Sequence, residues 1–267
     1  MKNIIRTGIG MLGLAVVLTA SSVVFIRAHA STVVSAGSAA SEVRPVNASI
    51  VNIVLSGPID LTLKQAVTPE LLVKGDPKLV AKITTRLEGN TLYIGTRGIY
   101  ISVGKTEQSK IELSLPNLEK LQSSGSGDAS IKGFRGNKLE LLVQGSGNVS
   151  LDGEYQQVFA NVHGSGDLAL GLANSDVLEL NVHGSGDSII KGQAKTFNAK
   201  LTGSGDLNAS SLKSAQVNLN STGSANSRVF ASQEIKLKLM GSGDVHVSGN
   251  PAKRNVERMG SGDIRWE

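Results

Sequence analysis

One four-residue motif recurs along the second half of this 267-residue chain. Gly-Ser-Gly-Asp or a near copy begins at eight glycines, and consecutive copies are 18 to 20 residues apart. The copies begin at Gly125, Gly145, Gly164, Gly184, Gly203, Gly223, Gly241 and Gly260. Self-similarity at a fixed period of this length is the signature of a repeat architecture, so the motif constrains the fold before any site is considered.

The sequence on either side of each motif alternates between apolar and polar residues. Apolar residues stand two, four and six positions before the first glycine in five copies, those at Gly145, Gly164, Gly184, Gly203 and Gly241, and the alternation resumes after the motif, as at Val149 and Leu151. This period of two is typical of strands with one buried face, and the paired glycines would break a helix. The residues predicted to face outward include Asn161, Asn181, Lys200, Asn220 and Lys238.

A unit of about 19 residues cannot bury its apolar side alone, but stacked copies bury a continuous core. We therefore predict an all-β fold in which residues 123–267 form a parallel β-solenoid of about eight coils, each of 18–20 residues. The chain has 31 glycines and only nine aromatic residues, one Trp, three Tyr and five Phe. A narrow core of small aliphatic side chains agrees with that composition.

Residues 45–122 are predicted to form a β-rich N-terminal part without the repeat. Alternating residues predict strands at 49–56 and 59–64 around a Gly57-Pro58 turn, and a third at 70–74. Asp76-Pro77 is a helix start signal, so a short helix is expected from there to Lys82 or Ile83. Further strands are expected at 91–94 and 111–115.

The first thirty residues have the pattern of a secretory signal peptide. Lys2 and Arg6 form a basic start, an uncharged stretch follows, and Ala28-His29-Ala30 offers a cleavage site before Ser31. An uncleaved membrane anchor is the alternative, because the uncharged stretch is long; after cleavage no membrane span is expected. Residues 31–44 are small and patternless and are predicted to be a flexible linker.

The absence of cysteine excludes disulfides and lipidation through a thiol. Together with the leader, this predicts an exported protein of a Gram-negative bacterium, located in the periplasm or at the cell surface. The formal charge of +5 does not indicate nucleic acid, because residues 125–267 carry 14 Lys or Arg and 14 Asp or Glu, and no basic stripe with aromatics is present.

The fourth motif position is an acid or an amide in every copy. Glycine and Asp or Asn favour tight turns, so the simplest interpretation is a structural turn ladder, Asp128, Asn148, Asp167, Asp187, Asp206, Asn226, Asp244 and Asp263. Stacked coils would place carboxylates about 4.8 Å apart. Their repulsion must be offset, either by N–H donors from the glycines of adjacent coils or by calcium, with Asp167, Asp187 and Asp206 as the candidate ligands.

His163 and His183 precede consecutive motifs at the same repeat position, so we expect them to stack on the outer face of adjacent coils. They are the candidates for a transition-metal site, but the adjacent repeats offer Gln144 and Thr202 and no third ligand. Solvated surface histidines are the simpler interpretation. No other cofactor is predicted.

No catalytic pattern is present in the repeats, where acids are dispersed one to a turn. The protein is therefore predicted not to be an enzyme, with a polysaccharide-active solenoid as the enzymatic alternative. Solenoid lyases of that kind use clustered charged groups in a groove that binds sugars. The nine aromatic residues of this chain leave few rings for stacking on sugars.

Three stretches, IVLSGPIDLTLKQ, LLVKGDPKLVAKITTRLEGNTLYI and LPNLEKLQSSGSGDASIKG, lead into the repeats. With them, residues 46 to about 250 resemble the family of putative autotransporter adhesins with a head GIN domain. The resemblance implies a right-handed β-solenoid with an irregular β-rich start on an exported bacterial protein. It implies no ligand and no catalytic residues. No translocating barrel follows Glu267, so we expect a protein that is not a self-sufficient autotransporter.

Two functions follow as expectations. The first is an adhesin or interaction module that presents a solenoid face to another protein or a glycan. The second is an envelope scaffold that self-associates end to end, because Ile264 to Glu267 continue the strand pattern without a polar cap and strand edges invite pairing.

Overall fold

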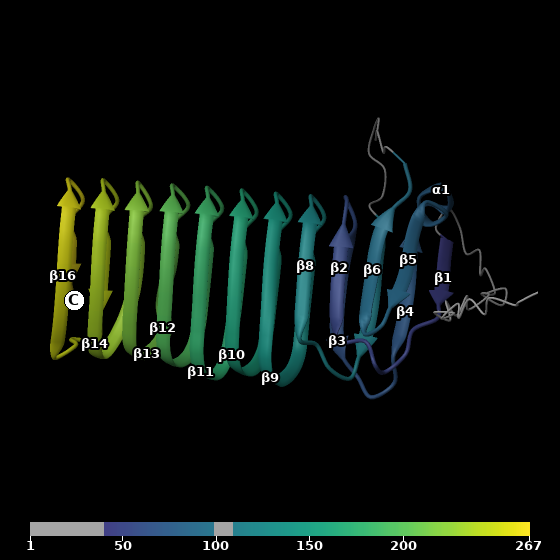
Figure 1. Ribbon diagram of the computed structural model, residues 1–267, viewed down its shortest axis with the longest axis horizontal. Helices are drawn as coiled ribbons and strands as arrows, with labels where there is room; N and C mark the ends of the chain where they lie inside the picture. The colour runs from purple at the N-terminus through teal and green to yellow at the C-terminus, as the bar shows by residue number, and fades with distance from the viewer. Residues whose placement is uncertain (1–39, 99–108) are drawn as a thin grey trace, which may run out of the picture.

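The computed structural model describes residues 40–98 and 109–267, which form one continuous stack of strands (Figure 1). The N-terminal part contains β1 (Ala40–Arg44), β2 (Asn52–Ser56), β3 (Asp60–Gln65), β4 (Glu70–Gly75), α1 (Pro77–Val80), β5 (Ile83–Glu88), β6 (Thr91–Thr96), β7 (Lys110–Leu115) and β8 (Lys120–Gly125). The repeats contain β9 (Ala129–Gly145), β10 (Val149–Gly164), β11 (Leu168–Gly184), β12 (Ser188–Gly203), β13 (Leu207–Gly223), β14 (Ser227–Gly241), β15 (Val245–Ser248), β16 (Lys253–Gly260) and β17 (Ile264–Trp266).

The repeats form the predicted parallel β-solenoid. Each strand from β9 to β14 is 15 to 17 residues long and pairs in parallel with the strands before and after it. Equivalent repeat positions lie opposite one another, so that Val158 pairs with Leu139 on one side and with Leu178 on the other. The solenoid has about seven turns, against the eight expected, because eight corners delimit seven complete coils.

The core is the thin aliphatic column that the alternation predicts. The residues predicted to face inward before the motifs are all buried, for example Leu178 and Leu180 at 0% exposure. Tyr155, Phe134 and Phe197 are the largest fully buried side chains of the described residues. Burying one Leu or Ile contributes about 1.5–3 kcal/mol, so the stack is stabilised by many similar increments, one set from each coil.

The long strands bend at the edge opposite the Gly-Ser-Gly-Asp corners, along the lower side of Figure 1. We call this side the curved edge; in β9 it comprises residues 132–138. The pairing register shifts there, between Asp152 and Glu154 for example. Buried polar contacts join the coils at this edge: Ser175 Oγ donates to the carbonyl of Tyr155 at 2.7 Å, and Tyr155 Oη donates to the carbonyl of Leu118 at 3.0 Å.

The N-terminal part stacks out of sequence order. β2 and β3 form a coil that pairs in parallel with β8 and β9 on one side and with β6 and β7 on the other. The chain therefore leaves the stack after β3, builds the outer layers, and returns across the first coil to begin β8. Consequently Leu61 lies between Ile111 and Ala129, although neither is near it in sequence.

Antiparallel strands close this end of the stack. β5 pairs with β6, β4 pairs with β7, and β1 pairs with the free edge of β4. The expectation that residues 31–44 are all linker is wrong for 40–44, which form β1. The Arg44 guanidinium holds the strand in place by donating to the carbonyls of Ile83 at 2.8 Å and Val80 at 3.1 Å.

Helix α1 begins where it was predicted and ends earlier. Asp76 is the N-cap, its carboxylate accepts from the Lys78 amide at 2.8 Å, and Pro77 is the first helical residue. The helix ends at Val80 rather than at Lys82 or Ile83, because Ile83 is buried as the first residue of β5. The predicted signal peptide and residues 31–39 lie outside the described residues. No helix in 40–98 and 109–267 is long and apolar enough to cross a membrane.

The last coil carries arginines where earlier coils carry core residues. Arg254 pairs with Ile235 and Arg258 with Leu239, on the inward face of β16. Arg254 lies 4.2 Å from the Trp266 ring centre and donates to the Pro251 carbonyl; Arg258 donates to the carbonyl of Gly262. The expectation of an end without a polar cap is therefore wrong. The available signal was in the sequence, because Arg254 and Arg258 stand six and two residues before Gly260, at the inward positions of the alternation.

Candidate functional site

The Gly-Ser-Gly-Asp corners align into one straight edge of the solenoid, at the top of Figure 1. The first glycine of each corner has φ between +122° and +141°, which L side chains rarely adopt. A Cβ on Gly164 would also overlap the carbonyl oxygen of Gly145, which accepts from the amides of Ser165 and Gly166. Glycine is required here by both backbone conformation and the close approach of the coils.

The fourth-position side chains form a continuous hydrogen-bonded ladder. Each Oδ1 accepts from the backbone N–H of the equivalent residue one coil further on, for example Asp187 Oδ1 from the Asp206 amide at 2.8 Å. The same bond joins every consecutive pair from Asp128 to Asp263, at 2.8–3.0 Å: Asp128, Asn148, Asp167, Asp187, Asp206, Asn226, Asp244 and Asp263. The predicted turn ladder thus links coils as well as turning the chain.

The bonding pattern explains why asparagine can replace aspartate. The ladder uses one acceptor per residue, and the amide oxygen of Asn148 or Asn226 supplies it. These two neutral residues also divide the column of like charges into short runs. The donors that offset the repulsion between the carboxylates are the backbone N–H groups of the Asp and Asn residues themselves. The backbone N–H groups of the glycines, which were expected to do this, do not bond the ladder side chains.

Sequence reasoning missed a ninth member of the ladder. Asp60 Oδ1 accepts from the Asp128 amide at 3.0 Å, and the carbonyl of Gly57 accepts from the Gly127 amide. Gly57-Pro58-Ile59-Asp60 keeps the first glycine and the final acid of the motif, and Leu61 and Leu63 follow at the offsets of Ala129 and Ile131. That alternation was the available signal, but the 68 residues between the two corners hid the period.

The structure stacks the candidate metal ligands without gathering them into a cluster. His163 and His183 stack as predicted, with ring centres 5.5 Å apart and planes within 4°, between Gln144 and Thr202. Asp167, Asp187 and Asp206 follow one another along the ladder, each with Oδ1 occupied by the next amide. Within 40–98 and 109–267, no group of three or more His, Cys, Asp or Glu is arranged to hold a metal ion.

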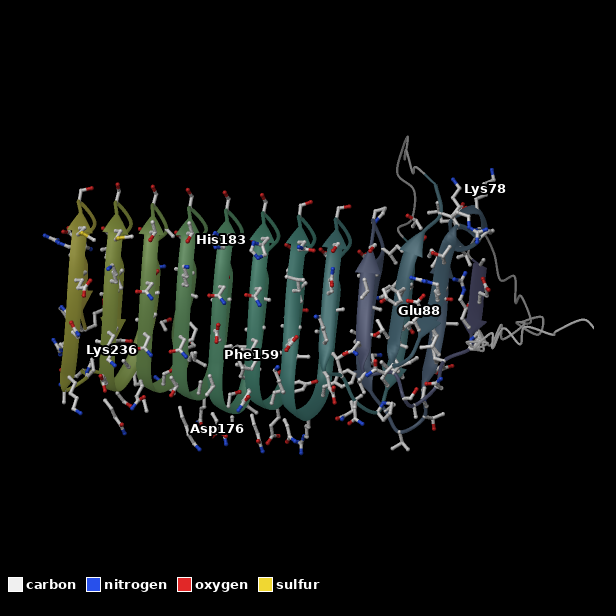
Figure 2. All side chains as sticks on the ribbon, in the orientation of Figure 1. Lys78, Glu88, Phe159, Asp176, His183 and Lys236 are labelled. Carbon is white, nitrogen blue, oxygen red and sulfur yellow. The ribbon has the colours of Figure 1, made fainter. Side chains whose placement is uncertain are left out.

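A flat polar face runs along the strands that precede the corners. Figure 2 shows its side chains in rows that cross neighbouring coils, with His183 and Lys236 in two of them. Asn181 Nδ2 donates to Asn161 Oδ1 at 3.1 Å, and Asn218 Nδ2 donates to Asn198 Oδ1 at 2.6 Å. Because these amides bond one another, their side chains are held in a fixed array.

Charged side chains of both signs gather on and beside the curved edge, where Asp176 is labelled in Figure 2. Lys195 pairs with Asp176 at 2.5 Å, and Lys138 with Glu140 at 2.6 Å. The hydrogen bond from Lys138 is the main cause that lowers the pKa of Glu140. Burial raises the pKa of Tyr155, whose hydroxyl stays protonated as a donor.

Comparisons with known proteins agree with this architecture. The family model described as "Putative auto-transporter adhesin, head GIN domain" matches residues 49–251. No curated protein matches the chain.

Three solved structures have the same fold. A putative adhesin from Parabacteroides distasonis aligns with TM-score 0.78 at 22% identity, over 86% of this chain and 98% of its own. A putative adhesin from Parabacteroides merdae aligns with TM-score 0.78 at 20% identity, over 86% and 97%. A putative lipid binding protein from Parabacteroides distasonis aligns with TM-score 0.68 at 27% identity, over 85% and 96%.

Proposed function

The chain belongs to the family of putative auto-transporter adhesins with a head GIN domain, and from this premise we propose that it is an exported, non-catalytic adhesion module. The observation that carries the proposal is the pre-formed outer surface of the solenoid. The amide pairs Asn161–Asn181 and Asn198–Asn218 hold polar groups in place before any partner arrives. Pre-organised groups lose less conformational entropy on binding, which favours recognition by a broad surface.

The interior supports a surface function. The inward positions of the coils are filled by buried aliphatic side chains, and the corner edge is closed by the ladder. A partner must therefore bind to the outside of the solenoid. The family and the signal peptide predicted at residues 1–30 support export, and we propose the cell surface as its location, where an adhesin must be exposed.

The two ends of the stack argue against the scaffold alternative. One end is covered by β1, whose Arg44 binds the carbonyls of Val80 and Ile83. At the other end, pairing a second solenoid onto β16 would bury Arg254 and Arg258 on its inward face. Removing these guanidinium groups from water is costly even though Arg258 pairs with Asp263 at 3.5 Å, and inward charges are a known protection of sheet edges.

Surface exposure and adherence test the proposal together. Intact cells are treated with protease, and beads coated with residues 31–267 are assayed for attachment to host-cell or bacterial surfaces. We expect digestion on intact cells and attachment above that of uncoated beads. Digestion only after the outer membrane is opened would refute the adhesive role. Light scattering of the purified chain addresses the scaffold, which requires mass to grow with concentration.

A further inference from the structure

Two neighbouring cavities lie along the curved edge, of about 630 and 480 Å³. The first lies between the turn into β8 and the bend of β9, and the second lies along the bends of β9, β10 and β11. Both are lined by Arg135, Gly136 and Asn137, so they adjoin each other at the bend of β9. We call the pair the edge groove. The volume of each cavity lies within the range of small-molecule binding sites.

The floor of the edge groove is fixed by a buried tyrosine. A Cβ on Gly136 would come within 2.9 Å of Tyr155 Cε1, so the bare backbone of Gly136 lies directly on the ring. Tyr155 is 1% exposed, and its hydroxyl is held by the carbonyl of Leu118, which lines the first cavity. The glycine and the anchored ring together leave room above them and prevent the floor from moving.

Exposed amides line the walls. Asn117 and Asn137 line the first cavity, and Asn137, Gln156 and Asn174 line the second. Unlike the paired amides of the flat face, these four side chains make no hydrogen bond within 40–98 and 109–267. Each amide offers two donors and an acceptor to a ligand.

The charged groups of the groove are close to balance, and most of them are paired. Lys120, Arg135 and Lys138 supply three positive charges, and Glu119, Glu140, Glu154 and Asp176 supply four negative ones, 3 − 4 = −1. Arg135 pairs with Glu154 at 3.4 Å, Lys138 with Glu140 at 2.6 Å, and Asp176 with Lys195 outside the groove. A ligand of either charge would meet like charges along the walls, so the lining favours an uncharged one.

We propose that the edge groove binds a neutral glycan. A sugar hydroxyl both donates and accepts, so an array of hydroxyls can use the amides, carboxylates and ammonium groups of this lining at once. The groove extends from β8 to β11, about 14 Å along the stack, which suits an extended oligosaccharide. Lys138, which lines the first cavity, places its Nζ 5.0 Å from the ring centre of half-buried Phe159, which Figure 2 labels.

This inference rests on the proposed adhesive function and gives it a ligand class. The test uses residues 31–267 on an array of neutral mannose-, galactose- and N-acetylglucosamine-terminated oligosaccharides, with sialyl-lactose and heparin fragments as charged comparators. The strongest neutral binder is then titrated calorimetrically against two variants. Asn137→Ala/Asn174→Ala removes two groove amides, and Gln233→Ala removes an exposed amide of β14 that lines neither cavity and lies outside the flat face.

We expect neutral oligosaccharides to bind and charged ones not to. The double variant should weaken binding about tenfold or more, since two hydrogen bonds are lost, while Gln233→Ala stays within about twofold. All three amides are exposed, so circular dichroism should show an unchanged fold.

Binding of charged probes alone, or neutral binding that the double variant leaves unchanged, overturns the groove assignment. If coated beads attach but no neutral oligosaccharide binds, the adhesive function stands on another ligand, such as a protein. If the beads do not attach while the oligosaccharide binds, the groove is a glycan site and the adhesive function fails.

Discussion

The repeats from β9 onward and the N-terminal part solve the same stacking problem in different ways. From β9 to β14, each coil lies between two near copies of itself, so one set of residues satisfies both neighbours. The N-terminal part has antiparallel pairs, a helix and an out-of-order coil, and Asp60 is its one described member of the ladder. A repeated set of residues is thus sufficient to stack a coil only where that coil has a similar coil on both sides. The N-terminal end of the stack uses other elements instead, namely antiparallel strands and a helix.

The first prediction concerns the first glycine of a corner, the position where the repeat tolerates a side chain least. Gly184→Ala places a Cβ against the carbonyl of Gly164 at a φ of +141°, and we expect it to lower the free energy of unfolding by about 3–5 kcal/mol or to prevent folding. Gly89→Ala in the N-terminal part has φ +59° and nothing within 4 Å, so about 1 kcal/mol is expected. Denaturant unfolding measures both, and equal losses would contradict the close-approach argument.

The second prediction concerns the hydrogen bond from Tyr155 in the repeats to Leu118 in the N-terminal part, which joins the two regions. Tyr155→Phe leaves the buried Leu118 carbonyl without its donor, so we expect a loss of about 1–3 kcal/mol. The raised pKa of Tyr155 also predicts a pH effect. Above about pH 10 the unfolded state releases the phenol proton and the folded state keeps it, so stability falls as pH rises.

Thermal unfolding of the wild type and of Tyr155→Phe between pH 8 and 11 tests that sign. The gap between the two proteins should narrow as pH rises, because the variant has no proton to lose at this position. Titrating lysines affect both proteins equally. A gap that stays constant with pH would show that Tyr155 does not carry the effect.

The third prediction tests what the ladder requires of its side chains. Asp187→Ala removes the acceptor of the Asp206 amide, and we expect a loss of about 1–2 kcal/mol. Asp187→Asn keeps the acceptor, as Asn148 and Asn226 do, and removes one charge from a run of three carboxylates. It should stay within about 0.5 kcal/mol and become relatively more stable at low salt. Similar losses for both variants would mean that the carboxylate charge itself matters.

The repeats could be predicted almost completely from the sequence, and the N-terminal part could not. Period and alternation reveal corners, buried positions and the parallel stack, because each coil repeats local information. The place of Leu61 between Ile111 and Ala129 depends on pairing between distant segments, for which no local pattern exists. The edge groove depends on register shifts such as that between Asp152 and Glu154, which a fixed period does not describe.

The smallest predicted effect concerns serines inside the repeats. Ser221 and Ser227 are buried at inward positions where neighbouring coils have Leu or Val, and their hydroxyls have no hydrogen-bond partner in the described structure. Ser188, which pairs with Leu168 and Leu207, is a third buried serine of this kind.

Replacing either serine by alanine keeps the size and removes an unsatisfied hydroxyl, so Ser221→Ala and Ser227→Ala should each raise stability by up to about 1 kcal/mol. Ser175→Ala is the matched control, because Ser175 is equally buried but donates to the Tyr155 carbonyl at 2.7 Å. That substitution should lower stability by about 1 kcal/mol. Denaturant midpoints measure the three variants, and a loss at Ser221 or Ser227 as large as at Ser175 would show that their hydroxyls are bonded in solution.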